Sequence, residues 1–494
     1  MNGEALLLAA LLTPLARAAA AVLMPRPPGL RDLVNIGLAL AHAAAALLLA
    51  FATSRDGSIV VTLAQPLPGV EFALAAEPLG AMIVAGTAVL AVAHAFHTAG
   101  YLRATRDAAP ARLQAMIGLA SMSAAGVLLA ANLFTLYVFY QALILAAFGL
   151  TSHAGDAAAR AAAGRLLATL LAASAGLLLP AIVWTYGAAG DLQFRLGGFL
   201  EGRVGPISAN ILLALFAFGY AAAAAPPLHR WASGVAAAPY PAAAAILALY
   251  VAPAGAGALL KTTLSVFGDA MADAQIVARL LLALACATMI AAALVALSKQ
   301  DIRERLAYTT VAQVAAVMAG AMVANPAGAF AGALQIVAFA CAALTMWMAA
   351  GAAYVATGWT EAREMVGLGR RMPWTFAGFA LGAASLIGLP PLAGAWPKLW
   401  LITAGAEPVQ ATGQAELIWA GALAAAASIA AFASLGPMAL RALTGPSPTD
   451  PFRRPDAASI FLVGPVLIAA ACTFALIAVA DRLAAFLLPI WSQP

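Results

Sequence analysis

The stretch Ala327–Val355, with the sequence AGAFAGALQIVAFACAALTMWMAAGAAYV, decides the fold class of this chain. It runs for 29 residues without a charged side chain. A helix needs about 20 apolar residues to cross the hydrocarbon core of a membrane, and it satisfies its backbone hydrogen bonds within the segment. The apolar residues do not alternate with polar ones, as they would in a transmembrane β-strand. The stretch therefore predicts a membrane-spanning helix.

Similar apolar runs fill the rest of the chain. Of its 494 residues, 64% are hydrophobic and 9% are charged, whereas soluble domains carry about 25% charged residues. The sequence predicts an all-α, polytopic membrane protein with one transmembrane domain over residues 1–494. The fourteen expected spans are Ala5–Met24, Val34–Phe51, Leu79–Ala95, Leu113–Ala131, Phe134–Leu150, Leu166–Tyr186, Ile207–Ala225, Ala242–Leu260, Leu280–Leu297, Leu306–Ala324, Ala327–Val355, Trp374–Thr403, Leu417–Leu435 and Ile460–Ala480. We expect the first span to be a retained helix, because it lacks a basic start and a clear cleavage site.

Lysine and arginine are unevenly distributed among the loops between these spans. The odd-numbered loops hold seventeen of them, whereas the even-numbered loops and the C-terminus hold six, namely Arg55, Arg195, Arg203, Lys261, Arg279 and Arg482. Cytoplasmic loops are enriched in Lys and Arg, so both termini are expected on the outer, periplasmic side of a bacterial inner membrane. The net charge of +5 then reflects orientation and lipid headgroups, and it gives no case for nucleic acid as a partner.

Prolines interrupt three spans. They are Pro226 and Pro227 at the end of the seventh, Pro253 in the eighth, and Pro390, Pro391 and Pro397 in the twelfth. A proline lacks a backbone donor and clashes with the carbonyl four residues back. In lipid, such breaks persist where protein or water satisfies the freed groups, and transporters use broken helices to build ion sites. We expect helices 7 and 12 to be broken, and a simple packing kink is the interpretation for Pro253.

A series of motifs lies between Glu77 and Lys398. They are Glu77–Leu79 (EPL), Asn132–Tyr140 (NLFTLYVFY), Pro227–Trp231 (PLHRW), Ala238–Pro241 (APYP), Gln300–Gln313 (QDIRERLAYTTVAQ), Gly367–Trp374 (GLGRRMPW) and Ile387–Lys398 (IGLPPLAGAWPK). In order and wording they resemble motifs of the antiporter-like membrane subunits that respiratory complex I (NADH:quinone oxidoreductase) shares with multisubunit Mrp-type Na⁺/H⁺ antiporters. The wording of Gly367–Trp374 favours the Mrp branch, and within it the D-type subunits.

The resemblance implies an antiporter-like fold of fourteen helices, with a core at about 77–435 and flanking helices in 1–76 and 436–494. It also implies partners, namely other membrane subunits of a multisubunit complex, antiporter-like paralogues among them, together with lipids. It implies no cofactor. The sequence holds no phosphate-binding loop, cysteine cluster or nucleophile motif that would indicate an enzyme, so any redox catalysis would lie in partner subunits. His94 and His97 lie one helical turn apart, but without further ligands no metal site is predicted.

In this family, protons are thought to move along ionisable side chains at mid-membrane. Five of the matching positions carry other residues here, namely Gln141 in the fifth span, Ala222 in the seventh, Pro253 in the eighth, and Phe339 and Ala343 in the eleventh. None of these side chains gains or loses a proton near neutral pH. Alanine also lets helices approach closely, which leaves little room for water. The alternative is that alanine creates space that water fills.

Three ionisable residues remain as candidates for a proton or ion pathway. Lys398 matches the family's twelfth-helix position, and it could relay protons or bond the carbonyls that the nearby prolines free. Lys261 closes the eighth span and is expected near the membrane interface. His229 lies in a loop, where a structural hydrogen bond and proton exchange are the two interpretations.

Two functions follow from these residues. One is an active subunit that translocates H⁺, or exchanges Na⁺ for H⁺, by means of Lys398 and water. The other is a structural subunit that keeps the fold and docks beside its partners while the usual proton relay is lost. The sequence favours the second, within a cation- or proton-translocating, Mrp-type or complex I-like assembly.

Overall fold

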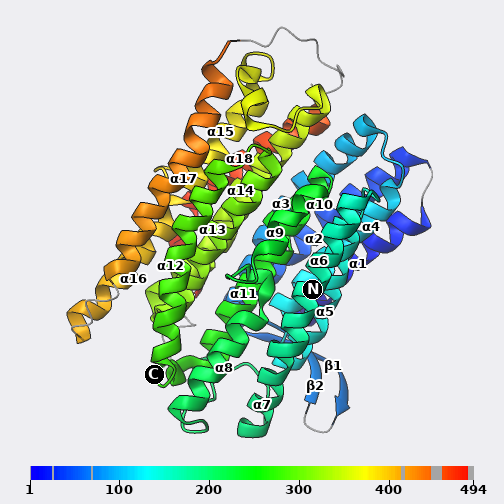
Figure 1. Ribbon diagram of the computed structural model, residues 1–494. Coiled ribbons are helices and arrows are strands. Elements are labelled where there is room, and N and C mark those ends of the chain that lie inside the picture. Colours follow the sequence, from blue (N-terminus) through cyan, green and yellow to red (C-terminus); the bar gives the residue numbers. More distant parts are fainter. Residues whose placement is uncertain (1, 25–26, 68–69, 413–417, 447–458, 488–494) are drawn as a thin grey trace.

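The computed structural model describes residues 2–24, 27–67, 70–412, 418–446 and 459–487. Its long helices are α1 (Gly3–Leu23), α2 (Pro28–Asp56), α3 (Pro78–Thr105), α4 (Pro110–Leu128), α5 (Leu133–Thr151), α6 (Ala157–Ala173), α12 (Gln275–Ser298), α13 (Ile302–Met322), α14 (Pro326–Thr357), α16 (Ala395–Thr412), α17 (Ile418–Thr444) and α18 (Ile460–Ala478). The shorter helices are α7 (Leu179–Ala189), α8 (Pro206–Gly219), α9 (Arg230–Gly234), α10 (Tyr240–Ala244), α11 (Val251–Thr262), α15 (Pro373–Ile387) and α19 (Ala480–Leu487). Figure 1 shows them as one bundle of roughly parallel and antiparallel helices.

Short 3₁₀ and π-helical segments join or extend these helices. They are η1 (Ser174–Leu178), η2 (Ala221–Ala223), η3 (Val235–Ala237), η4 (Ala245–Leu249), η5 (Thr263–Phe267), η6 (Gly268–Ala272), η7 (Ala362–Met365) and η8 (Leu368–Arg370). Several of them lie inside expected spans, because π-helical turns accommodate interruptions of the regular α-helical bonding pattern.

The polytopic, helical fold class is confirmed. Each of the fourteen expected spans coincides with one helix or with a helix and its continuation, although Leu417, the start of the thirteenth, lies outside the described residues. Within the described ranges, eleven helices are long and apolar enough to cross a membrane. The two shorter helices α8 and α15 are also apolar. The exact count of fourteen spans stays a prediction.

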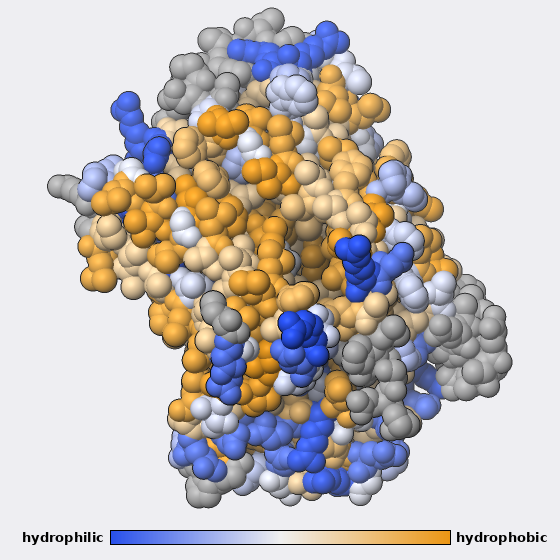
Figure 2. All heavy atoms as spheres, turned by 180° about the vertical axis from the view of Figure 1, so that it is seen from behind, coloured by the Kyte–Doolittle hydropathy of each residue, from blue (hydrophilic) through white to orange (hydrophobic). Residues whose placement is uncertain are grey.

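The surface of the bundle is apolar between two hydrophilic ends. Large hydrophobic side chains such as Leu145, Ile276, Ile429 and Ile468 are 60%, 72%, 71% and 53% exposed. Figure 2 shows these apolar surfaces around the middle of the molecule, with hydrophilic residues gathered toward the top and bottom. An exposed apolar belt of this kind is unfavourable in water and is typical of a surface that faces the hydrocarbon core of a membrane.

The structure contains a β-hairpin between the second and third expected spans, where the all-α prediction had no strand. Strands β1 (Ile59–Leu67) and β2 (Val70–Ala76) pair antiparallel between α2 and α3. The segment is rich in β-branched and aromatic residues, such as Val60, Val61, Thr62 and Phe72, which favour strands. The hairpin is an addition to an otherwise helical fold.

Helix α14 lies at the centre of the bundle. It packs against α3, α13, α15, α16 and α18, and its most apolar membrane-spanning stretch is entirely buried. Helices α1 and α2 pack against each other and against α4 and α3. The division into a core at about 77–435 and two flanks stays a prediction.

Candidate functional site

The expected break of the seventh helix begins before its two prolines. Helix α8 ends at Gly219, and the chain continues through the 3₁₀ turn η2 into Ala224, which has a left-handed φ of 50°. Two aromatic side chains satisfy the backbone of this turn. The indole nitrogen of Trp231 donates to the Ala221 carbonyl at 2.9 Å, and the Ala222 N–H donates to the Tyr140 hydroxyl at 2.9 Å. Protein groups therefore satisfy these two freed backbone groups of the break.

The eighth helix is also broken, where the sequence suggested a simple kink at Pro253. The π-helix η4 ends at Leu249, and Tyr250 has the irregular dihedral angles φ −122° and ψ −60° before α11 begins. Pro253 has no N–H to donate to the carbonyl of Leu249, four residues earlier, and its ring crowds that carbonyl. The interruption thus falls at the residues that the proline affects.

The two broken helices press against each other at Gly255. A Cβ atom on this glycine would lie 2.6 Å from the Ala223 nitrogen and 2.7 Å from the Ala222 Cβ. Such distances leave no room for a side chain at Gly255 unless the helices separate. Ala222 itself is 1% exposed.

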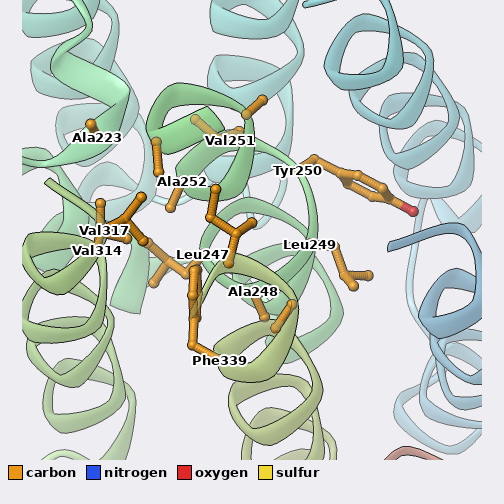
Figure 3. Packing of buried hydrophobic residues seen from close by; sticks show 14 of the residues in the cluster. Ala223, Leu247, Ala248, Leu249, Tyr250, Val251, Ala252, Val314, Val317 and Phe339 are labelled. Carbon is orange, nitrogen blue, oxygen red and sulfur yellow. The ribbon is translucent and has the colours of Figure 1, made fainter. Parts of the chain in front are cut away.

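The remaining family relay positions lie in apolar or weakly polar surroundings. Phe339 and Ala343 on α14 are 2% and 4% exposed. Figure 3 shows Phe339 beside Leu247 and Ala248 of the broken eighth helix, with Val314 and Val317 of α13 completing the group. We call Leu247, Val314, Val317 and Phe339 the apolar cluster. Among the described residues of this group there is no side chain that carries a proton.

Gln141 on α5 makes one side-chain contact. Its amide oxygen accepts a hydrogen bond of 3.3 Å from the Ser174 hydroxyl in η1. Its amide nitrogen is shielded from solvent and has no partner in the described part of the chain. The position therefore provides hydrogen-bonding atoms but no titratable group.

Lys398 lies in the first turn of α16, across the break of the twelfth helix. Its ammonium group donates to the carbonyls of Leu386 and Ile387 at 2.8 and 2.6 Å. These carbonyls close α15, and the chain leaves that helix through Gly388 with φ 92°. These hydrogen bonds are the ones expected if Lys398 has a structural role at the helix break. A role of Lys398 in proton transfer stays a prediction.

Two glutamines share the surroundings of Lys398. Gln313 of α13 donates to the Leu386 carbonyl at 3.2 Å, and Gln335 of α14 donates to Gln313 at 2.7 Å. With Lys398 and Pro397 they line a cavity of about 20 Å³. A volume of about 10–15 Å³ or more holds one water molecule, so this cavity, in which three polar side chains interrupt an otherwise apolar lining, has room for a single water.

Lys261 is buried within the protein beside an acidic side chain, and its expected position near the membrane interface stays a prediction. Its side chain is 3% exposed and lies 3.1 Å from a carboxylate oxygen of Glu77. It also donates to the Ala130 carbonyl at 2.6 Å, and its ammonium group lies 4.6 Å from the centre of the Phe194 ring. The sequence predicted no partner for Lys261. It indicated Glu77 only as part of the motif Glu77–Leu79.

The choice between the two interpretations of His229, a structural hydrogen bond and proton exchange, stays a prediction. The Nδ1 atom of this histidine is shielded and unpartnered within the described residues, and its ring lies edge-on to Tyr308, 6.5 Å between centroids. Burial and the neighbouring Arg230 lower the pKa of His229. Among the described residues, the three ionisable candidates lie in separate environments and share no hydrogen-bond partner.

A set of buried polar groups near the N-terminus was not expected from the sequence. Arg17, His42 and His94 are 2%, 4% and 0% exposed. His94 and His97 each contact a backbone carbonyl at 2.9 Å. No group of three metal ligands occurs among the described residues, so these histidines gain no further candidate ligands there.

Comparisons with known proteins agree with this architecture. The family described as "NADH:quinone oxidoreductase/Mrp antiporter, TM" matches residues 130–420. NADH-quinone oxidoreductase subunit N of Desulfitobacterium hafniense is 30% identical over 321 residues, which are 60% of this chain and 62% of that protein. The D-type subunit of a Na⁺/H⁺ antiporter from Alkalihalophilus pseudofirmus is 28% identical over 56% of each chain. The matches thus span less than two thirds of these relatives' length.

Two solved structures share the fold over nearly the whole chain. A chain of the membrane-bound sulfane sulfur reductase, an archaeal respiratory membrane complex, superposes with a TM-score of 0.83 at 22% identity, covering 98% of this chain and 97% of that one. A chain of the Mrp complex from Dietzia sp. gives a TM-score of 0.80 at 22% identity, covering 98% and 96%. With its family match over more than half its length, this chain belongs to the NADH:quinone oxidoreductase/Mrp antiporter transmembrane family.

Proposed function

We propose that this chain is an antiporter-like subunit of a multisubunit cation- or proton-translocating membrane complex, in which it has a structural, docking role and conducts few or no protons by itself. The named relatives are subunits of NADH-quinone oxidoreductases and of a Na⁺/H⁺ antiporter. We place the chain, by analogy, beside antiporter-like paralogues in a bacterial inner membrane, with lipids around it, both termini on the outer side and any redox reaction in partner subunits.

The apolar cluster carries this proposal. A proton crosses a membrane protein along titratable groups or along waters held by polar partners. Leu247, Val314, Val317 and Phe339 are at most 2% exposed and pack against one another at the depth where the helices break. Their surfaces offer neither a proton acceptor nor a hydrogen bond to water, so this layer opposes a continuous proton path.

The close approach of the broken helices supports the same conclusion. Gly255 lies against Ala222 and Ala223 so tightly that an added Cβ would clash. The alternative interpretation, that alanine leaves space for water, is not favoured at this contact. The hydrogen bonds of Lys398 to two backbone carbonyls explain why a lysine is retained at this position without a role in proton transfer.

One observation favours the second candidate, an active subunit that uses Lys398 and water. The cavity of about 20 Å³ places Lys398 beside the amides of Gln313 and Gln335, and Gln335 has a shielded oxygen without a partner among the described residues. A water there would extend the polar surroundings of Lys398. The apolar cluster opposes an extension of that path from α14 toward the eighth helix.

Proton flux in liposomes distinguishes the two candidates. The purified chain, and a complex that contains it, would be reconstituted with a pH-sensitive dye inside, with an imposed pH gradient as the driving force. We expect the chain alone to show flux at the level of empty liposomes, and Lys398→Ala to leave the flux of the complex unchanged. Lys299→Ala serves as the control, because that lysine pairs with Glu304 at the partly exposed start of α13.

The docking role has its own readout. Deletion of the chain should dissociate the complex, as measured by native electrophoresis or size-exclusion chromatography of the remaining subunits. Proton flux through the purified chain that Lys398→Ala removes would contradict the proposal and support the active subunit. An intact complex without this chain would contradict the docking role.

A further inference from the structure

The first helix carries a buried arginine that the family motifs do not account for. Arg17 lies six residues before the end of α1 and is 2% exposed. Its Nε donates to the Asn35 side-chain oxygen at 2.8 Å, and the hydroxyl of Tyr250 is a further, neutral hydrogen-bond partner of the guanidinium. A guanidinium stays protonated in proteins, and a charge deep in a membrane costs about 2.5–3.5 kcal/mol even on lenient scales.

The described residues supply no negative charge to Arg17. The ionisable groups that face it are Tyr250, His42 and His94. Asp32, on the same helix as Asn35, is already shared: Arg31, Arg103 and Gln114 each contact its carboxylate, at 3.2, 2.8 and 2.9 Å. The positive charge of Arg17 is therefore left without a counter-charge.

Two further hydrogen-bond donors beside Arg17 lack acceptors among the described residues. They are Nδ2 of Asn35 and the O–H of Tyr250, whose oxygen faces the guanidinium. The orientation of the Asn35 amide is set, because arginine only donates, so the oxygen faces Arg17 and the NH₂ group is the free donor. In Figure 3, Tyr250 points away from the apolar cluster toward the blue, N-terminal helices. The hydroxyl of Tyr250 lies beside the guanidinium of Arg17, with which it interacts.

We propose that Arg17, Asn35 and Tyr250 bind a small inorganic anion of the halide class between α1, α2 and the break of the eighth helix. A fixed positive charge and two neutral donors are the groups that an anion needs, and charge-assisted hydrogen bonds are the stronger kind. Water could accept from the same donors, but it would leave the charge of Arg17 uncompensated. The bound anion would also tie the broken helix to α1 and α2. This site is independent of the proposed function.

The dependence of the melting temperature on the halide concentration tests the site. The purified full chain would be exchanged into sodium gluconate and titrated with chloride or bromide at constant ionic strength. A ligand that binds the folded state raises its stability, so the melting temperature should rise and saturate. Arg17→Gln keeps a donor for Asn35 but removes the charge, and it should abolish the rise. Tyr250→Phe should weaken the apparent affinity at least tenfold.

Arg160→Gln is the matched control. Arg160 is exposed, and its contact is with the Gly155 carbonyl near the start of α6, so its response to halide should equal that of the wild type. A wild-type melting temperature that is the same in gluconate and chloride would overturn the proposal, as would a full response in Arg17→Gln. If Arg17→Gln does not fold, a bromide-soaked crystal of the wild type decides. Anomalous density beside Arg17, Asn35 and Tyr250 is expected, and its absence there would overturn the site.

Discussion

The ammonium group of Lys261 lies 3.1 Å from a carboxylate oxygen of Glu77, and the two side chains are 3% and 14% exposed. Glu77 immediately precedes α3, and Lys261 lies near the end of α11. The ion pair therefore joins the start of one spanning helix to the last turn of a broken one. The Ala130 carbonyl accepts a further bond from Lys261, which links the same point to the turn between α4 and α5.

Removal of one partner should cost more than removal of both. Lys261→Met leaves the Glu77 carboxylate buried without its counter-ion, and breaking a buried pair in this way costs about 3–5 kcal/mol. We expect Lys261→Met to lower the free energy of unfolding by about that amount, as measured by denaturant titration in detergent. The double variant Glu77→Gln/Lys261→Met should be more stable than Lys261→Met alone. Strictly additive losses would show that the two side chains do not interact.

The contact between the two broken helices predicts a specific glycine requirement. Gly255→Ala places a methyl group 2.6–2.7 Å from atoms of Ala222 and Ala223, and overpacking of this kind costs about 1–3 kcal/mol. The matched control is Gly164→Ala in α6, where an added Cβ meets nothing within 4 Å. We expect the melting temperature to fall for Gly255→Ala and to stay the same or rise for Gly164→Ala. Equal effects would mean that η2 and α11 are not in close contact.

The bonds of Lys398 predict that its loss affects stability. Lys398→Met keeps the length of the side chain but leaves the Ile387 carbonyl without its donor, while Gln313 still donates to Leu386. A buried polar group without a partner costs about 1–3 kcal/mol. We expect a drop of this size in the free energy of unfolding. Lys398→Arg, which can still donate to both carbonyls, should recover most of it; a failure of both variants to change stability would contradict the structural role.

Asp107 predicts a pH dependence of stability on the side of the expected cytoplasmic loops. It lies between α3 and α4. Burial raises its pKa, but the hydrogen bonds from His153 and from the Ala109 N–H outweigh this, and the net pKa is below the ordinary value. A carboxyl whose pKa is lower in the folded state stabilises the protein above its unfolded pKa, and this contribution disappears as the pH falls through the folded pKa.

The wild type should therefore lose more stability on acidification than Asp107→Asn. We expect the difference between their melting temperatures to be constant near neutral pH and to shrink between about pH 5 and pH 2. Glu201→Gln, at an exposed position, is the control and should follow the wild type. A difference that stays constant over the whole acidic range would contradict the role of the carboxylate.

The positions of the spans could be predicted because long apolar runs have few alternatives to membrane helices. Local chemistry also located the break at Gly388–Pro391. The break of the eighth helix was misjudged at Pro253, because the sequence does not reveal whether a proline kinks a helix or interrupts it. That outcome depends on the tertiary contacts that satisfy the freed groups.

Contacts between distant residues were beyond the reach of the sequence. The pairing of Lys261 with Glu77, 184 positions away in the chain, arises from the fold and has no local pattern. Arg17 gave no signal because one arginine does not interrupt an apolar run. The β-hairpin was missed because Ile59–Leu67 is short and alternates imperfectly, whereas its strand character depends on pairing with Val70–Ala76.

A high-resolution cryo-EM map of the chain in lipid, with ordered solvent resolved, tests the central claim most directly. The map should show water confined to the small cavity beside Lys398, Gln313 and Gln335, with no solvent between Leu247, Val314 and Phe339. A continuous file of ordered waters that passes Phe339 and reaches Ala222 and Gln141 would contradict the account.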